Sequence, residues 1–258
     1  MSAAKLAWAF GLAAALGCDL ALAPPPAARA DPYLPDLDRL TTDGSTYRDT
    51  YGEYVIEERD AGFERIPTGR ITALDPIVYA EADPEPFTAA IAPGDYQVKA
   101  FVAQLSRDCA PTERRVAALQ LVVSDEPAAS WQPALRPGQD GSDLGEDQYY
   151  GYPSDAATGA IADVAAVAAL SGWDEARFEK AFLSPSSAHW FRDPIPGLLN
   201  VVADPASGAN LVTVTTGFGD GSYPTFVGRS AQGQITSFVT DFLVVPKSDE
   251  PARCPKAR

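Results

Sequence analysis

Histidine and cysteine are scarce in this sequence. The 258 residues include one histidine, His189, and three cysteines, Cys18, Cys109 and Cys254. The sequence has no H-E-x-x-H, C-x-x-C, Walker or Rossmann glycine pattern, so the usual signals of zinc, nucleotide and dinucleotide chemistry are missing. A Ser-His-Asp or Cys-His mechanism would depend on His189 alone, and we interpret that residue as structural or as a surface residue.

Basic residues are also few. The chain has 20 Lys and Arg against 35 Asp and Glu, a formal net charge of −15. Such a surface repels nucleic acid and anionic lipid headgroups and favours basic partners, so nucleic-acid binding is excluded. The content of 46% apolar and 21% charged residues is ordinary for a globular protein, and 20 Gly with 23 Pro indicates many turns.

No apolar run is long enough to span a bilayer. Leu6–Gly17 is wholly apolar after a single positive charge, and Asp19 interrupts it well short of the ~20 residues that a spanning helix needs. This pattern predicts a secretory signal over residues 1–30, with cleavage after Ala28-Arg29-Ala30. Alternatively, Ala15-Leu16-Gly17-Cys18 resembles a lipobox, with Cys18 lipidated. We favour the first route, and expect a secreted or periplasmic protein that touches membrane only if Cys18 carries a lipid anchor.

Removal of residues 1–30 leaves 18 basic and 34 acidic side chains, a net charge of −16. Either route also removes or caps Cys18, so two cysteines remain. An even pair in an oxidising compartment predicts a disulfide, here Cys109–Cys254, and both residues lie in polar surroundings. The alternative is two unrelated thiols. A bridge that encloses about 145 residues would stabilise the fold by up to about 4–5 kcal/mol.

The mature chain divides into an N-terminal arm (31–52), one domain (53–246) and a tail (247–258). We predict an α+β fold that is mostly antiparallel β, a sandwich or partly open barrel, with a small helical insertion. Strands are expected over 53–59, 69–74, 87–91, 96–105, 115–123, 128–135, 211–216, 223–228 and 234–245. Asp163 is expected to cap a helix over 164–170, and a second short helix is expected over 173–182.

Three blocks of sequence carry a family resemblance. They are GRITALDPIVY with PFTAAIAPGDYQV (69–98), RRVAALQLVVSDEPAASW with LGEDQYYGYPSDAATGAIAD (114–163), and GFGDGSYPTFVGRSAQGQITSFVTDFLVV (217–245). On these blocks the chain resembles the bacterial family of unknown function DUF4241, and the resemblance implies no catalytic residues. The family reads V-D-A-G-T-G where this chain has Ser154 to Gly159, so Ala157 stands in place of a glycine.

Carboxylates are the remaining candidates for chemistry. Asp155, Asp220 and Asp241 lie in the family-like blocks, and a pair of them could act as acid and base on a sugar or bind a hard cation. Asp220 is flanked by glycines, and the alternative for it is a role in closing a turn. For Asp241, inside a strand-like run, we expect exposure at a sheet edge or a partner such as Arg229.

A loop rich in acids is a calcium candidate. It contains Asp140, Asp143, Glu146 and Asp147, although the spacing does not match an EF-hand, and a solvated loop is the alternative. Nearby aromatics would suit a carbohydrate or a basic protein partner if they share a surface, and would otherwise fill the core; they are Tyr149, Tyr150, Tyr152, Tyr223 and Phe226.

Three functions fit these observations. The first is a non-enzymatic binding or envelope-associated exported protein, favoured by the missing catalytic signatures. The second is a carboxylate-dependent hydrolase that acts on an extracellular polymer. The third is an immunity-type inhibitor of a basic protein, which rests on the acidity.

Overall fold

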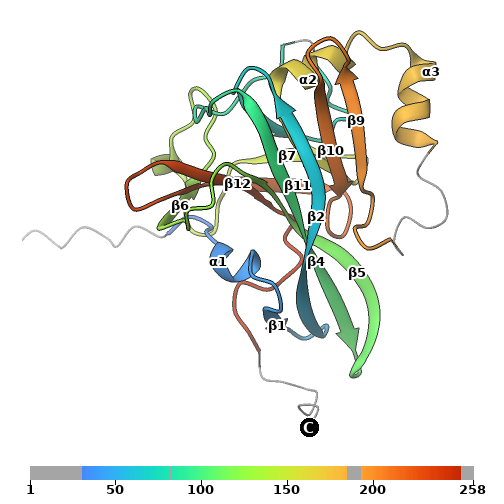
Figure 1. Ribbon diagram of the computed structural model, residues 1–258. Helices are drawn as coiled ribbons and strands as arrows, with labels where there is room; N and C mark the ends of the chain where they lie inside the picture. Colours follow the sequence, from blue (N-terminus) through green and yellow to red (C-terminus); the bar gives the residue numbers. More distant parts are fainter. Residues whose placement is uncertain (1–30, 82, 185–192, 251–258) are drawn as a thin grey trace, which may run out of the picture.

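The computed structural model describes residues 31–81, 83–184 and 193–250 (Figure 1). The predicted signal, Cys18, His189 and Cys254 lie outside these residues. The fold is α+β and mostly antiparallel β, as predicted, with two sheets and no closed barrel. The strands are β1 (Thr46–Arg48), β2 (Glu53–Ile66), β3 (Ile71–Leu74), β4 (Gly94–Arg107), β5 (Ala110–Val122), β6 (Ser130–Pro133), β7 (Gly151–Ser154), β8 (Thr158–Asp163), β9 (Leu199–Asp204), β10 (Ala209–Thr215), β11 (Gly221–Arg229) and β12 (Ile235–Asp241).

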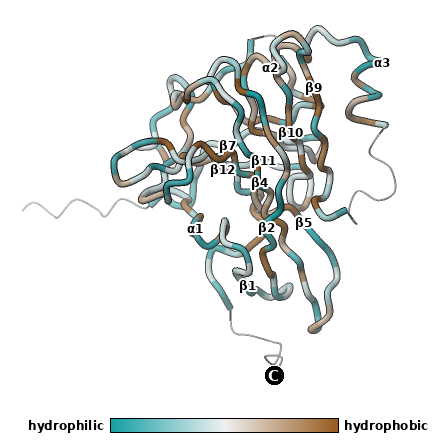
Figure 2. Tube along the Cα trace, viewed as in Figure 1, coloured by the Kyte–Doolittle hydropathy of each residue, from teal (hydrophilic) through white to brown (hydrophobic). Residues whose placement is uncertain are grey.

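The larger sheet has the order β1-β2-β4-β5-β12-β11-β6, and β7 also pairs with β11. The long antiparallel hairpin of β4 and β5 confirms the strands predicted over 96–105 and 115–123. Residues 115–122 are strand and not helix, because their apolar side chains pack into the core between two neighbouring strands. Figure 2 shows hydrophobic residues concentrated along these strands and hydrophilic residues in many of the connections.

The smaller sheet has the order β3-β8-β10-β9 and supports the helices. Helix α2 (Val164–Leu170) begins where predicted, since the Asp163 side chain accepts a hydrogen bond from the Ala165 N–H at 2.8 Å. The second predicted helix is a short α3 (Glu175–Phe178) continued by one π turn (Glu179–Leu183). Phe182 from this turn is fully buried in a second apolar cluster, where its ring lies beside those of Phe178 and Trp173.

Two side chains join the sheets. Glu64 on β2 accepts the Val212 N–H of β10 at 2.8 Å, and Asn210 accepts the Arg65 N–H at 2.7 Å. Both bonds run between strands of different sheets, so the edge of β2 is tied to the middle of the smaller sheet. The main apolar core lies alongside this junction and includes residues of both sheets.

The predicted N-terminal arm is part of the core. Strand β1 pairs with β2, and helix α1 (Leu37–Leu40) buries Leu37 and Leu40 in the main cluster. A bond of 2.7 Å between Arg39 and Asp249 joins this segment to the end of the described chain. The folded unit therefore extends beyond residues 53–246 at both ends. No helix of the described residues is long and apolar enough to cross a membrane.

Three local predictions differ from the structure. The strand expected over 87–91 is reduced to one isolated bridge between Arg70 and Ala90. The last strand ends at Asp241, because Leu243 takes a left-handed backbone conformation (φ +55°) that stops the ladder. Strands β1, β7, β8 and β9 were not predicted; each has six residues or fewer, too few for a clear pattern of alternation.

Candidate functional site

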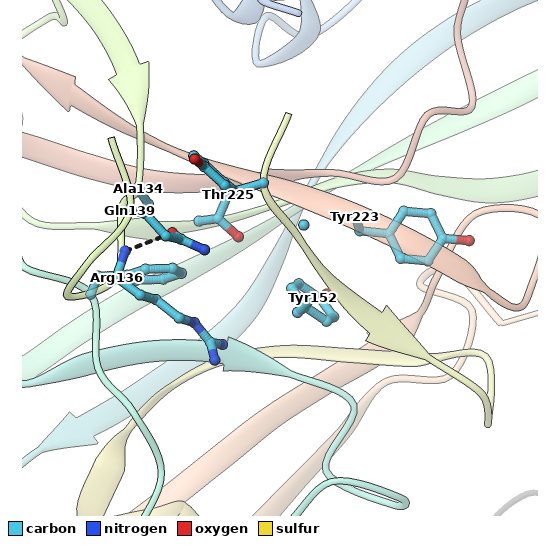
Figure 3. Close-up of a pocket in the computed structure, with 9 residues that line it drawn as sticks. Ala134, Arg136, Gln139, Tyr152, Tyr223 and Thr225 are labelled. Atoms are coloured by element: carbon cyan, nitrogen blue, oxygen red, sulfur yellow. Dashed lines mark hydrogen bonds between the residues drawn. The ribbon is translucent and has the colours of Figure 1, made fainter. Parts of the chain in front are cut away.

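A groove lies between the loop after β3 and the start of β7, and Arg136 forms one of its walls. The groove has a volume of about 200 Å³, and its lining includes Tyr79, Glu81, Glu85, Arg136 and Tyr152. A smaller cavity of about 20 Å³ shares Arg136 and Tyr152 with it (Figure 3). We call the two hollows together the Arg136 groove.

Arg136 is held in place without an ion pair. The backbone N–H of Arg136 donates to the Gln139 Oε1 at 2.8 Å, as the dashed line in Figure 3 shows. In the side chain, Nη2 donates to the Ala73 carbonyl at 3.0 Å. Among the described residues no carboxylate lies within ion-pair distance of its guanidinium. A guanidinium has five N–H donors, so several of them remain available to a ligand.

Two buried tyrosines line the Arg136 groove. Tyr152 and Tyr223 are 5% and 4% exposed, and their ring centroids are 6.3 Å apart. Burial raises the pKa of both phenols, so they stay neutral hydrogen-bonding groups. The aromatic cluster considered from the sequence is thus divided, because Tyr152, Tyr223 and Phe226 are buried whereas Tyr149 and Tyr150 are partly exposed.

A buried aspartate shapes the turn beside the groove. Asp75 is fully buried and accepts hydrogen bonds from the Ile77 N–H (3.0 Å), the Ala156 N–H (2.8 Å) and the Ser154 hydroxyl (3.1 Å). These bonds fix the β7–β8 turn, in which Ala157 has a φ of +52°. Glycine adopts this conformation more easily than alanine, which accounts for the glycine of the family pattern.

Asp155 and Asp220 adjoin the same end of the β7–β11 ladder, and neither of them lines the groove. The ladder of β7 and β11 ends with the pair Ser154 and Gly221, so Asp155 and Asp220 follow at the same end of the two strands. Both are exposed. Asp155 also accepts a hydrogen bond from the hydroxyl of Tyr79, which lines the groove. Two of the three candidate aspartates thus follow the same end of one pair of strands, and Asp155 contacts a residue of the groove.

Asp241 lies apart from this pair, and the prediction of edge exposure for it was wrong. Strand β12 runs between β5 and β11, and Asp241 is only 2% exposed. Its partner is Tyr33, whose hydroxyl donates to Oδ2 at 2.7 Å, and not Arg229. Burial raises the Asp241 pKa to about 6, while the hydrogen bonds from Tyr33 and the Leu243 N–H lower it.

Two acids of the acidic loop already have partners within the protein. Asp140 accepts a hydrogen bond from the Ser142 N–H at 2.7 Å, and Asp147 forms an ion pair with Lys247. Within residues 31–81, 83–184 and 193–250, no group of three or more His, Cys, Asp or Glu could hold a metal ion. The calcium hypothesis therefore gains no support from Asp140, Asp143, Glu146 and Asp147.

Cys109 lies where the sequence suggested, in the turn between β4 and β5. Because Cys254 is outside the described residues, the disulfide stays a prediction.

The sequence analysis did not single out Arg136, Tyr79 or Asp75. Each is a single residue in a loop, and the only available signal was that Asp75 and Tyr79 fall inside the first family-like block.

A family described as a protein of unknown function (DUF4241) matches residues 65–240 of this chain. This range includes Asp75, Tyr79, Arg136, Tyr152 and the β7–β11 end with Asp155 and Asp220. No curated protein and no solved structure matches the chain.

Proposed function

Since this chain belongs to the DUF4241 family, for which no function is known, we propose that it is an exported, non-enzymatic binding protein. The charged and apolar order of residues 1–30 supports export, and the missing catalytic signatures support a binding role. The Arg136 groove is the ligand site in this proposal, because it lies within the family-matched region.

The observation that carries the proposal is the Arg136 guanidinium, which forms no ion pair within the part of the chain that the structure describes and lies in a groove that also holds tyrosines and glutamates. Arg136 offers donors, Glu81 and Glu85 offer acceptors, and Tyr79 offers an aromatic ring. This mixture suits a polyhydroxylated ligand, and we infer a carbohydrate whose acidic substituent pairs with Arg136. A hollow of about 200 Å³ is smaller than the ~300 Å³ of typical ligand pockets, so it fits one sugar unit of a longer chain.

The test is a titration of the full chain with uronic-acid oligosaccharides and with neutral ones. We expect Arg136→Met to weaken binding of the acidic oligosaccharides by about 10- to 100-fold, the usual value of a hydrogen-bonded charge. Arg70→Met is the matched control, because Arg70 is exposed and does not line the groove.

Equal binding by wild type and Arg136→Met would contradict the groove as the site. Binding of basic proteins but of no oligosaccharide would favour the inhibitor hypothesis instead.

Export has its own test. The exported protein is expected to begin at Asp31 or at a lipidated Cys18, and intact mass spectrometry distinguishes the two. A soluble cytoplasmic protein that retains Met1 would contradict export.

A hydrolase remains the second candidate, and the neighbouring Asp155 and Asp220 favour it. Two carboxylates near a sugar-binding groove could serve as acid and base. Polymer hydrolysis lost in both Asp155→Asn and Asp220→Asn, with binding kept, would support this function. Wild type without activity on any polymer that it binds would exclude it.

A further inference from the structure

The two hollows of the Arg136 groove differ in the charge of their walls. The larger hollow, of about 200 Å³, is lined by Glu81 and Glu85. Both glutamates are exposed, and no ion pair joins either of them to another of the residues that the structure describes. The lining of the smaller hollow, of about 20 Å³, contains no acidic residue. An anionic group is therefore repelled in the larger hollow and not in the smaller one.

Arg136 lies at the border between the two hollows. It lines both of them, as does Tyr152 (Figure 3). Its Nη2 donates to the Ala73 carbonyl at 3.0 Å, and Ala73 lines the larger hollow. The carbon of its guanidinium lies 5.8 Å from the ring centre of Phe87, which lines the smaller hollow. The remaining N–H donors of the guanidinium can thus serve a ligand that extends over both hollows.

The smaller hollow suits a carboxylate. Gln139 lines it and accepts the Arg136 backbone N–H through Oε1, so its amide nitrogen remains a donor beside the guanidinium. A cavity needs roughly 10–15 Å³ to hold one water molecule. A hollow of about 20 Å³ therefore admits a group of a few atoms and excludes a sugar ring.

Tyr150 gives the smaller hollow an aromatic wall. This residue is partly exposed and precedes β7, and its hydroxyl donates to the Asp140 carbonyl at 3.2 Å. An aromatic ring that is held in place and partly open to solvent can pack against the apolar face of a sugar. The adjacent Tyr149 is also partly exposed, but it lines neither hollow.

We propose that the Arg136 groove binds a neutral sugar unit and the acidic unit that follows it, in a fixed orientation. The neutral unit occupies the larger hollow, where Glu81 and Glu85 accept hydrogen bonds from its hydroxyl groups. The acidic unit packs on Tyr150, and its carboxylate enters the smaller hollow and pairs with Arg136. The inference rests on the proposed function and adds to it the order of the units and the residues that select this order.

The first test compares three oligosaccharides of equal length by calorimetric titration of the full chain. Acidic and neutral units alternate in a hyaluronan tetrasaccharide, all units are acidic in tetragalacturonic acid, and all are neutral in cellotetraose. We expect the hyaluronan tetrasaccharide to bind most tightly and cellotetraose most weakly. Tetragalacturonic acid should fall between them, because it places a second carboxylate against Glu81 and Glu85.

Removal of the two glutamate charges sharpens this test. Glu81→Gln/Glu85→Gln should strengthen the binding of tetragalacturonic acid by about 3- to 10-fold, a modest gain because both carboxylates are exposed. Cellotetraose binding should not change. The matched control is Glu126→Gln/Glu175→Gln, which removes the same charge from exposed positions that line neither hollow and should change no affinity.

The outcomes separate this inference from the proposed function. Equal binding of the hyaluronan tetrasaccharide and tetragalacturonic acid, each weakened by Arg136→Met, would overturn the orientation and leave the groove as the ligand site. The absence of a gain in Glu81→Gln/Glu85→Gln would do the same. Binding of none of the three oligosaccharides would contradict the proposed function and the inference with it.

The second test concerns the aromatic wall. Tyr150→Ala should weaken binding of the hyaluronan tetrasaccharide by about 3- to 10-fold, the usual value of an aromatic contact. The neighbouring Tyr149→Ala should leave this affinity unchanged, and thermal unfolding verifies that both variants are folded. Equal effects of the two substitutions would overturn the role of Tyr150.

Discussion

The buried carboxylates of the two sheets differ in the number of hydrogen bonds that they accept. Around the smaller sheet, Asp163 accepts hydrogen bonds from the N–H groups of Thr68, Gly69 and Ala165 at 2.8–3.1 Å. On the larger sheet, Glu64 accepts one N–H, from Val212, and its Oε2 has no partner within the described residues.

Asp75 and Asp241 repeat this contrast. Asp75 accepts three backbone N–H groups and one hydroxyl, and Asp241 accepts one N–H and one hydroxyl. A carboxylate with several N–H donors organises the loops that supply them. A carboxylate with few donors keeps its desolvation penalty, and burial accordingly raises the pKa of Glu64 well above its ordinary value. For Glu64 and Asp241, which have few donors, burial raises the pKa and so favours the protonated form.

The largest expected effect is at Asp163. Asp163→Ala leaves three buried or partly buried N–H groups without an acceptor, and we expect a loss of about 3–5 kcal/mol in the free energy of unfolding. Urea unfolding measures it. The matched control is Asp174→Ala, which removes the exposed cap of α3, with an expected loss of about 1 kcal/mol. Similar losses in the two variants would mean that Asp163, with its several N–H donors, contributes no more to stability than the exposed cap Asp174.

Glu64 is expected to show the strongest pH dependence. Because burial raises its pKa in the folded state, its contribution to stability is fully present below the ordinary glutamate pKa and is lost as the pH rises. Glu64→Gln removes this loss, so we expect the variant to exceed wild type in stability at pH 8 and to equal it at pH 4. Chemical unfolding at both pH values checks this, and a variant that is less stable at pH 8 would contradict it.

Asp241 is expected to behave in the same way but less strongly, because it has two donors. Its pKa rises from 3.8 to about 6 on folding, so stability falls as the pH rises through that window, by roughly 3 kcal/mol in all. Asp241→Asn should flatten the profile between these pH values. Tyr33→Phe removes a donor to the carboxylate and should steepen it. An unchanged profile in both variants would show that Asp241 does not titrate on folding.

The smallest effect is expected in the turn that Asp75 holds. Ala157 has a left-handed backbone (φ +52°), and Ala157→Gly should stabilise the protein by about 0.5–1 kcal/mol, after the greater entropy loss of glycine is subtracted. Ala156→Gly is the control, since Ala156 has no positive φ, and should be neutral or destabilising. Thermal unfolding compares the two, and equal changes would mean that the turn is not strained.

Local patterns predicted what depends on local sequence. Strands β4 and β5 and the cap at Asp163 were found where predicted. The burial of Asp241 could not be predicted, because it depends on the position of β12 between β5 and β11 and on Tyr33, 208 residues away. The neighbourhood of Asp155 and Asp220 likewise depends on the pairing of β7 with β11. Arg136 acquires its setting from Ala73 and Gln139, and only the second of these is close in sequence.

The bond between Arg39 and Asp249 joins residues separated by 210 positions. The entropy of closing so long a loop must be overcome before this contact stabilises anything, and folds dominated by such contacts form slowly. This particular contact of the N-terminal helix therefore forms only after the last part of the chain has been synthesised, whereas the pairing of β1 with β2 does not depend on it.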